Sequence, residues 1–255
     1  MKLVTWNCKG PHRNTKFEID NFRENIKWLK ETYPDADLFA IQECSKEQVD
    51  SIRGNAEYGA KYAAWYGDDI DWFMRGTALF SNKRCFTERE EFYHNPDFRY
   101  VVPYSINIKE ESLIFTLFNV WTKAKPQNYK AYKTTNYHFY EKNVTEALAY
   151  YSELYFHPDT GIFDKPCLMI GDFNFGRHVA EVKNTFGKEI NKYGFVIPDI
   201  GENLLTFKNN KSSFYFNDTC IVKGLKAVIL QQAVTFDSMK DRSDHIPVAF
   251  EISSK

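Results

Sequence analysis

The stretch IGDFNFG, residues 170–176, places an acid, an amide and two glycines directly after an apolar run. That run, Cys167 to Ile170, predicts a short buried strand, because a brief apolar run bounded by turn residues is typical of one. Gly171 permits a tight exit from the core, and Asp172 and Asn174 follow it. Taken alone, these residues favour a turn, since Asp, Asn and Gly tolerate unusual backbone angles and hydrogen-bond their own main chain. Other stretches of the chain decide whether the segment is only a turn.

Three further strand ends repeat this pattern of an apolar run next to acid or amide side chains. LVTWN ends at Asn7, LFAIQE ends at Glu43, and DRSDHIPVAFEI carries Asp244 and His245. Carboxylate and amide oxygens gathered at the same end of neighbouring strands form the hard-oxygen environment that Mg²⁺ or Mn²⁺ prefers. Together with IGDFNFG, these strand ends predict a divalent-metal site.

A histidine–carboxylate pair is predicted beside that site. Asp218 lies inside the otherwise apolar stretch FYFNDTCIV, where an unpaired carboxylate is costly. His245 is the only one of the six histidines directly beside an acid. Its neighbour Asp244 points to the other face if both lie on a strand, so Asp218 is the natural partner. Such a pair fixes the imidazole tautomer and keeps the ring cationic near a phosphate.

The bulk composition is that of a soluble globular protein. A chain of 255 residues fits one α/β domain, and we expect a single domain over residues 1–255. The 33 basic residues nearly balance the 34 acidic ones, so no global field attracts nucleic acid or membrane. Binding to a polyanion must therefore come from local clustering of charge.

The cysteines and the N-terminal stretch predict the compartment. Five widely spaced cysteines without a CxxC pair argue against a disulfide framework or a zinc cluster, and for a reducing compartment. Cys8, Cys44 and Cys220 are interpreted as small core residues. MKLVTWNC is typical of a strand and not of a signal peptide, and no window approaches 18 apolar residues. We expect a cytoplasmic monomer that does not associate with membranes.

The hydrophobic pattern predicts mixed strands and helices without regular βαβ alternation, which favours two packed sheets with helices outside. The expected helices are 16–31, 45–53 (with Ser45 as its cap), 136–156 and 179–193. The expected strands are 3–7, 38–41, 61–66, 77–81, 99–108, 113–121, 167–170, 195–198, 204–207, 214–222, 227–235 and 247–252.

Four motifs in fixed order carry a resemblance to a known superfamily. TWNCKG, FAIQEC, IGDFN and SDHIPV together resemble the endonuclease/exonuclease/phosphatase superfamily, which includes deoxyribonuclease I, abasic-site endonucleases, inositol-polyphosphate phosphatases and deadenylases. The resemblance spans residues 3–252, and the variants WNC, QEC and VWTK particularly resemble uncharacterised bacterial members. It implies an α/β (α+β) four-layer sandwich of two mixed β-sheets packed face to face, with helices on both outer faces.

The resemblance also implies a role for each motif residue. Glu43 would be the main Mg²⁺ (or Mn²⁺) ligand, with Asn7 and Asp244 in the metal network. Asp172 would orient and deprotonate the attacking water, and Asn174 would hydrogen-bond the scissile phosphate.

For the predicted histidine–carboxylate pair, the resemblance implies that His245, paired with Asp218, polarises a phosphoryl oxygen. Two positions depart from the family pattern. Many nuclease members carry an acid where this chain has Lys9, and a His or Tyr where it has Trp121. An indole only donates its N–H, so a metal-bound water or another residue would protonate the leaving group, unless that group is already good.

Two stretches are candidate substrate contacts. Arg177 and His178 lie near a predicted helix start, where they would touch a substrate phosphate or form an exposed loop pair. The stretch 119–140, which contains Trp121 and Lys123, interleaves lysines with aromatic rings and has no acid. It is either a track for a polyanion or a solvated lysine loop.

The leading prediction is a divalent-metal-dependent phosphodiester hydrolase, a nuclease (endonuclease or exonuclease) acting on DNA or RNA by in-line attack. The alternative is a phosphatase or phosphodiesterase of a small-molecule or lipid-headgroup phosphate, which the neutral charge and Trp121 keep open. A catalytically dead binding module is disfavoured, because all the motif residues occur together.

Overall fold

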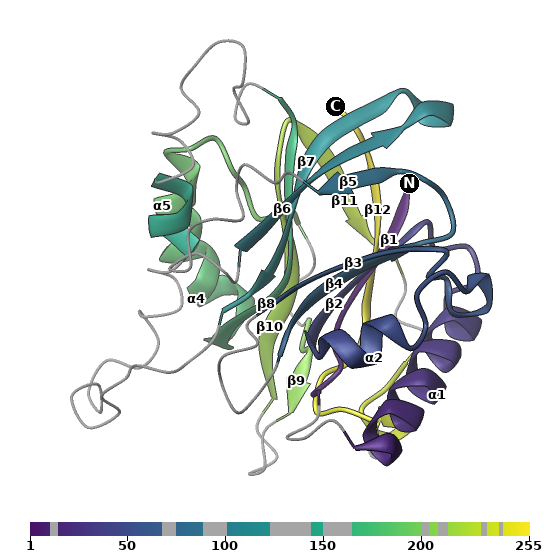
Figure 1. Cartoon of the computed structure of the whole chain (residues 1–255). Coiled ribbons are helices and arrows are strands. Elements are labelled where there is room, and N and C mark those ends of the chain that lie inside the picture. The colour runs from purple at the N-terminus through teal and green to yellow at the C-terminus, as the bar shows by residue number, and fades with distance from the viewer. Residues whose placement is uncertain are drawn as a thin grey trace.

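The structure is a computed structural model in which two six-stranded mixed sheets pack face to face and helices cover both outer faces (Figure 1). It confirms the predicted four-layer sandwich. The structure describes residues 1–10, 15–67, 75–88, 101–122, 144–149, 165–199, 204–208, 214–230, 234–239 and 242–255.

The first sheet has the strand order β11-β12-β1-β2-β4-β3. Within it β1 and β2 are parallel, and the other neighbours are antiparallel. Its strands are β1 (Lys2–Asn7), β2 (Leu38–Cys44), β3 (Tyr62–Gly67), β4 (Gly76–Ser81), β11 (Leu225–Ile229) and β12 (Val248–Ser254).

The second sheet has the strand order β5-β6-β7-β8-β10-β9. Here β7 and β8 are parallel, and the other neighbours are antiparallel. Its strands are β5 (Phe86–Glu88), β6 (Val101–Ile108), β7 (Leu113–Trp121), β8 (Cys167–Arg177), β9 (Phe207–Lys208) and β10 (Phe214–Lys223).

The first two helices begin at residues that cap their N-termini. Thr15 and Ser45 each form a capping box at the start of α1 (Lys16–Thr32) and α2 (Lys46–Asp50), so Ser45 is the cap that the sequence predicts. The other helical segments are α4 (Val179–Asn184), α5 (Phe186–Asn191), residues 144–149, and the 3₁₀ turns η1 (Ala56–Tyr58), η4 (Lys109–Glu111) and η5 (Asp237–Met239). In the described part of the chain, every helix is too short or too polar to cross a bilayer.

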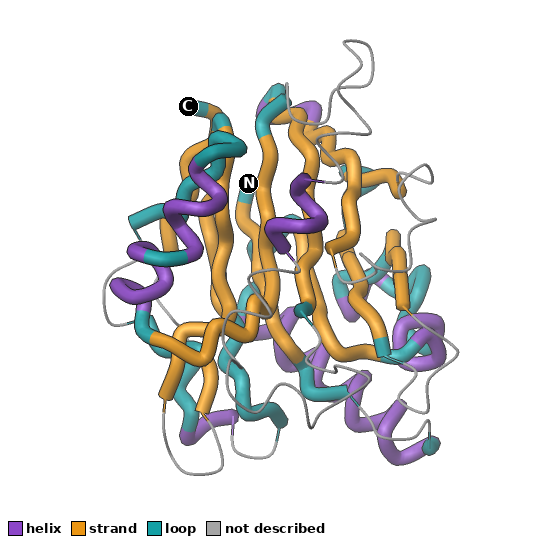
Figure 2. The backbone as a smooth tube through the Cα atoms, turned by 90° about the vertical axis from the view of Figure 1, so that its left-hand side faces the viewer, coloured by secondary structure: helices purple, strands orange, loops and turns teal. Residues whose placement is uncertain are grey.

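Alternation along β1 decides which side chains face the gap between the sheets. Leu3 belongs to the core between the sheets, whereas Val4 and Trp6 belong to the separate core under α1. Because successive strand residues point to opposite faces, Asn7 shares the face of Leu3 and points toward the second sheet. Both chain termini lie at one end of the sandwich, and Asn7 ends β1 at the other (Figure 2).

The segment IGDFNFG is part of a strand and not a turn. β8 continues through it to Arg177, because Phe173 and Phe175 are fully buried and stack with ring centroids 5.3 Å apart. The predicted exit at Gly171 is therefore wrong, although φ values of 142° at Gly171 and 50° at Asn174 bend the strand.

Other element predictions differ from the structure in detail. The predicted helix 179–193 is two helices, broken at Thr185, whose φ of −107° and ψ of −87° are not helical. Strand β5 was not predicted, and the strand expected at 195–198 is a single bridge from Val196 to Val222. Of the predicted helix 136–156, residues 144–149 are helical and the rest lies outside the described residues.

Gly171→Ala is expected to destabilise the fold by about 3 kcal/mol, through strain at a special backbone position. A Cβ at this position would lie 1.9 Å from the Val120 carbonyl oxygen on β7. The matched control is Gly187→Ala in α5, where the nearest atom is 3.6 Å away and the helix gains about 0.5–1 kcal/mol. Urea unfolding of both variants measures the difference, and equal shifts would contradict the expected clash.

Candidate active site

The motif residues converge at the end of the sandwich where β1, β2, β8 and β10 lie near one another. Asn7 Nδ2 donates to Glu43 Oε1 at 3.0 Å and to Asp172 Oδ2 at 2.8 Å. Asn7 and Asp172 are buried, and they belong to different sheets. The Asn7 amide therefore connects Glu43, the metal ligand predicted in the first sheet, with Asp172, the base predicted in the second.

Glu43 reaches this cluster because β2 is irregular at its end. Strict alternation would direct Glu43 to the α1 side, with Phe39 and Ile41. A register shift between Gln42 and Cys44, and a φ of 57° at Glu43, turn its side chain toward Asn7 instead. A bulge that re-aims one side chain is a frequent device beside active sites.

Asn174 holds Asp172 in place. Its backbone N–H donates to Asp172 Oδ1 at 2.8 Å, and its Nδ2 donates to Asp172 Oδ2 at 3.0 Å and to the Thr122 carbonyl at 2.8 Å. Its φ of 50° lies in the left-handed region, which asparagine adopts more readily than other non-glycine residues. Both N–H groups of the Asn174 side chain are bonded within the protein, so in this structure Asn174 orients Asp172.

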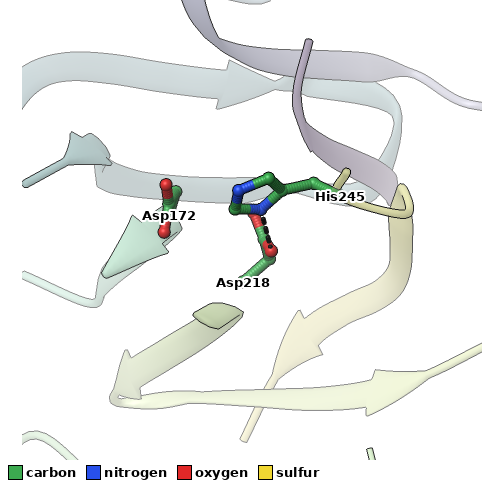
Figure 3. A group of neighbouring side chains, drawn as sticks. All are labelled: Asp172, Asp218 and His245. Atoms are coloured by element: carbon green, nitrogen blue, oxygen red, sulfur yellow. Dashed lines mark hydrogen bonds and ion pairs between the residues drawn. The ribbon is translucent and has the colours of Figure 1, made fainter. Parts of the chain in front are cut away.

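His245 and Asp218 form the predicted pair. His245 Nδ1 lies 2.7 Å from Asp218 Oδ2, and Asp218 is completely buried (Figure 3). Trp6 Nε1 donates to the His245 carbonyl at 3.1 Å and fixes the backbone at this point. Burial alone lowers the pKa of His245, but the charges of Asp218 and Asp172 outweigh it and raise the pKa to about 10. The ring is therefore an imidazolium at neutral pH.

Asp172 lies close to the pair, so that Asp172, Asp218 and His245 present ligand atoms within 4.8 Å of one another (Figure 3). Burial raises the pKa of Asp172 to about 7, and the Asp218 charge adds to this effect. The positive charge of His245 and the hydrogen bonds from Asn7 and Asn174 oppose it. The carboxylate of Asp172 is thus poorly compensated and basic enough to take a proton near neutral pH.

Two cations that contact the motif carboxylates were not assigned a role by the sequence. The Arg75 guanidinium donates to Glu43 Oε2, and both side chains are largely buried. Lys9 Nζ lies 3.0 Å from Asp244 Oδ2. No sequence motif includes Arg75, which directly precedes β4, so only the pairing of β4 with β2 brings it to Glu43.

The structure of the chain is similar to solved structures of a known fold. No family model matches the sequence, and no curated protein matches it significantly. An endonuclease/exonuclease/phosphatase family protein from Leptotrichia buccalis superposes with a TM-score of 0.60 at 14% identity, over 99% of each chain. The chain has the endonuclease/exonuclease/phosphatase fold.

Proteins of this fold with different named activities are similar to the chain. An AP endonuclease from Archaeoglobus fulgidus has a TM-score of 0.57 at 15% identity, over 98% of each chain. A mannosyl-6-phosphatase from Bacteroides thetaiotaomicron has a TM-score of 0.59 at 15% identity, over 99% of each chain. The endonuclease/exonuclease/phosphatase fold therefore does not by itself select the substrate.

Asp244, His178 and Trp121 are the remaining predicted site residues whose side chains the structure describes. Asp244 lies beside His245 in sequence and faces Lys9. His178 is exposed at the start of α4, and Arg177 ends β8. Trp121 is only 4% exposed, so its ring offers almost no surface on which a base could stack. Lys123 and the lysine-rich stretch beyond residue 122 lie outside the described residues.

The donor set suits a hard divalent cation. Glu43, Asp244 and the side-chain amide of Asn7 offer oxygen ligands, which Mg²⁺ and Mn²⁺ prefer. The raised pKa of Asp172 shows a buried carboxylate short of positive charge, which a cation would supply. Burial raises the pKa of the neighbouring Cys8 thiol, which is therefore neutral in the metal-free protein. All five cysteines are free and buried.

Proposed function

We propose that the protein is a divalent-metal-dependent phosphodiester hydrolase, a nuclease acting on DNA or RNA, with the chain as one catalytic domain. The observation that carries the proposal is the Asn7 amide, which holds Glu43 and Asp172 together beside the buried Asp218–His245 pair. The fold supports it, because proteins named as endonucleases and phosphatases share the fold.

Glu43, Asn7 and Asp244 would hold Mg²⁺ or Mn²⁺. When bound, the metal supplies positive charge that stabilises the phosphoryl oxygens and the leaving group.

Asp172 acts as the base. Burial raises the pKa of Asp172, which is the direction that a general base working near neutral pH requires. Asn174 keeps both carboxylate oxygens in a fixed orientation through two hydrogen bonds. Direct binding of the scissile phosphate by Asn174 would require one of its side-chain hydrogen bonds to break.

His245 stabilises the charge that develops on the phosphate. Asp218 occupies Nδ1, so the N–H at Nε2 is the group that donates to a phosphoryl oxygen. Ser243 Oγ accepts from the His245 backbone N–H at 3.1 Å and donates to the Asn7 carbonyl at 2.8 Å. The histidine and the metal-binding end of β1 are therefore positioned by the same hydroxyl.

A phosphatase or phosphodiesterase of a small-molecule or lipid-headgroup phosphate is the second candidate. The buried ring of Trp121 removes one predicted stacking surface for nucleic acid, and the near-neutral charge adds no long-range attraction.

A substrate panel with Mg²⁺, Mn²⁺ or EDTA tests the proposal. It should contain single- and double-stranded DNA, RNA, a duplex with an abasic site, bis(p-nitrophenyl) phosphate and p-nitrophenyl phosphate. We expect EDTA-sensitive cleavage of at least one polymer. Hydrolysis of the monoester alone would favour the second candidate, and no hydrolysis of any substrate would indicate a binding module.

Glu43→Gln is expected to reduce turnover by about 10²-fold and to raise the Mg²⁺ concentration needed for half-maximal rate, because a neutral amide is a poor ligand for a hard cation. The control is Glu57→Gln, which removes an exposed carboxylate paired with Lys27. Initial rates across a Mg²⁺ titration measure both effects. Wild-type turnover at limiting Mg²⁺ in folded Glu43→Gln would refute the assignment of Glu43.

A further inference from the structure

Among the described residues, three of the four predicted carboxylates have a cation of their own. Asp218 pairs with His245, Asp244 pairs with Lys9, and Glu43 pairs with Arg75. The proposed function assigns both Glu43 and Asp244 to the metal. The Glu43–Arg75 pair differs from the Asp244–Lys9 pair because both of its side chains are largely buried.

Both oxygens of Glu43 are engaged inside the protein. Asn7 donates to Oε1 and Arg75 donates to Oε2. The side chains of Arg75 and Glu43 are only 12% and 19% exposed, so water screens this pair weakly. A divalent cation bound to Glu43 would lie within a few ångströms of the guanidinium, and two like charges at that distance repel strongly.

The charges at the site show what could take the place of this contact. A divalent cation adds two positive charges beside Arg75 and Lys9. A singly charged phosphodiester supplies a negative charge with which the displaced guanidinium can pair.

The backbone of Arg75 keeps its side chain at the site. Arg75 directly precedes Gly76, which pairs with Cys44 on β2 and with Gly67 on β3. The guanidinium can therefore change partners by side-chain rotation while the backbone stays in the sheet. Its planar fork binds a carboxylate and a phosphate with the same geometry.

We propose that Arg75 is a substrate-binding residue that exchanges partners: it neutralises Glu43 in the metal-free protein, leaves Glu43 when a divalent cation binds, and then binds the phosphate of the substrate. This inference rests on the proposed metal-dependent phosphodiesterase. It makes metal and phosphodiester bind cooperatively, because the guanidinium released by one is used by the other.

Mn²⁺ binding, followed by the electron paramagnetic resonance signal of the free ion, tests the exchange without any turnover. Arg75→Gln should bind Mn²⁺ about tenfold more tightly than the wild type, because the competing cation is gone. The matched control is Arg53→Gln, which removes an exposed guanidinium paired with Asp50 and should bind Mn²⁺ like the wild type. Thermal unfolding establishes that each variant is folded.

Dimethyl phosphate, a singly charged diester with a very poor leaving group, tests whether Arg75 binds the phosphate once the metal is bound. It should tighten Mn²⁺ binding to the wild type about fivefold. The effect on Arg75→Gln should be smaller, because only the contacts of the phosphate with the metal and His245 remain in that variant. Arg75→Lys keeps the positive charge but lacks the planar guanidinium. Its Mn²⁺ affinity, and the change of that affinity with dimethyl phosphate, should lie between those of the wild type and Arg75→Gln. This second variant also carries the test if Arg75→Gln does not fold.

The outcomes separate the inference from the function on which it rests. Equal or weaker Mn²⁺ binding by Arg75→Gln, with clear binding by the wild type, would overturn the exchange and leave the metal site standing. An equal response of both proteins to dimethyl phosphate would overturn the phosphate contact. If neither protein binds Mn²⁺, both the exchange and the metal-dependent function are wrong. Binding by Arg75→Gln alone would support the exchange.

Discussion

Asp172→Asn is expected to lower turnover by about 10³-fold, because an amide cannot accept the proton of the attacking water. Among the described residues, no cation is paired with Asp172 alone, and burial raises its pKa to about 7. The substitution removes the basic group and keeps the shape of the side chain. Single-turnover rates with saturating Mg²⁺ measure the chemical step directly.

The stability of Asp172→Asn separates this role from a structural one. The variant loses acceptors for Asn7 and Asn174, whose N–H groups would then meet another amide N–H. It also removes a buried carboxylate whose charge the fold compensates poorly. We expect these effects to offset, with the free energy of unfolding within about 1 kcal/mol of wild type.

Asp37→Asn is the matched control for Asp172→Asn. Asp37 accepts from Lys83 and from the Lys2 backbone N–H, far along β2 from the cluster. Its substitution should cost some stability and leave turnover unchanged. Turnover of Asp172→Asn within about tenfold of wild type would exclude Asp172 as the base, since a general base contributes at least a hundredfold.

The sequence predicted the sandwich and the histidine pair because both follow from local patterns. Alternation along β1 places Asn7 between the sheets, and an acid inside the apolar strand β10 needs a buried partner. The observed distance of 2.7 Å from His245 Nδ1 to Asp218 Oδ2 confirms that partner.

Three features depend on contacts that no local pattern encodes: the bulge that turns Glu43, the position of Arg75 and the course of IGDFNFG. Glu43 faces the site only because a bulge and a positive φ override the alternation of β2. Arg75 reaches Glu43 through the pairing of β4 with β2, which joins residues about thirty positions apart. The turn reading of IGDFNFG was wrong because Phe173 and Phe175 are buried, and this tertiary packing keeps the chain extended.

His245→Ala and Asp218→Asn are each expected to lower kcat/KM by about 10²–10³-fold, and the double variant by little more. The reason is that Asp218 acts through His245: it holds the imidazolium by one short hydrogen bond and has no other assigned role. Residues that act as one unit are strongly non-additive in such a cycle. A double variant whose loss equals the product of the two single losses would show that they act independently.

The free energies of unfolding of the same variants test the pair independently of activity. His245→Ala leaves the Asp218 carboxylate fully buried without its cation, and among the described residues no donor reaches Oδ1. An uncompensated buried charge costs about 3–5 kcal/mol, so this single variant should be markedly destabilised. Adding Asp218→Asn removes that charge, and the double variant should therefore be more stable than His245→Ala. Denaturant unfolding of the four proteins measures this order, and a double variant less stable than both single variants would contradict a paired charge.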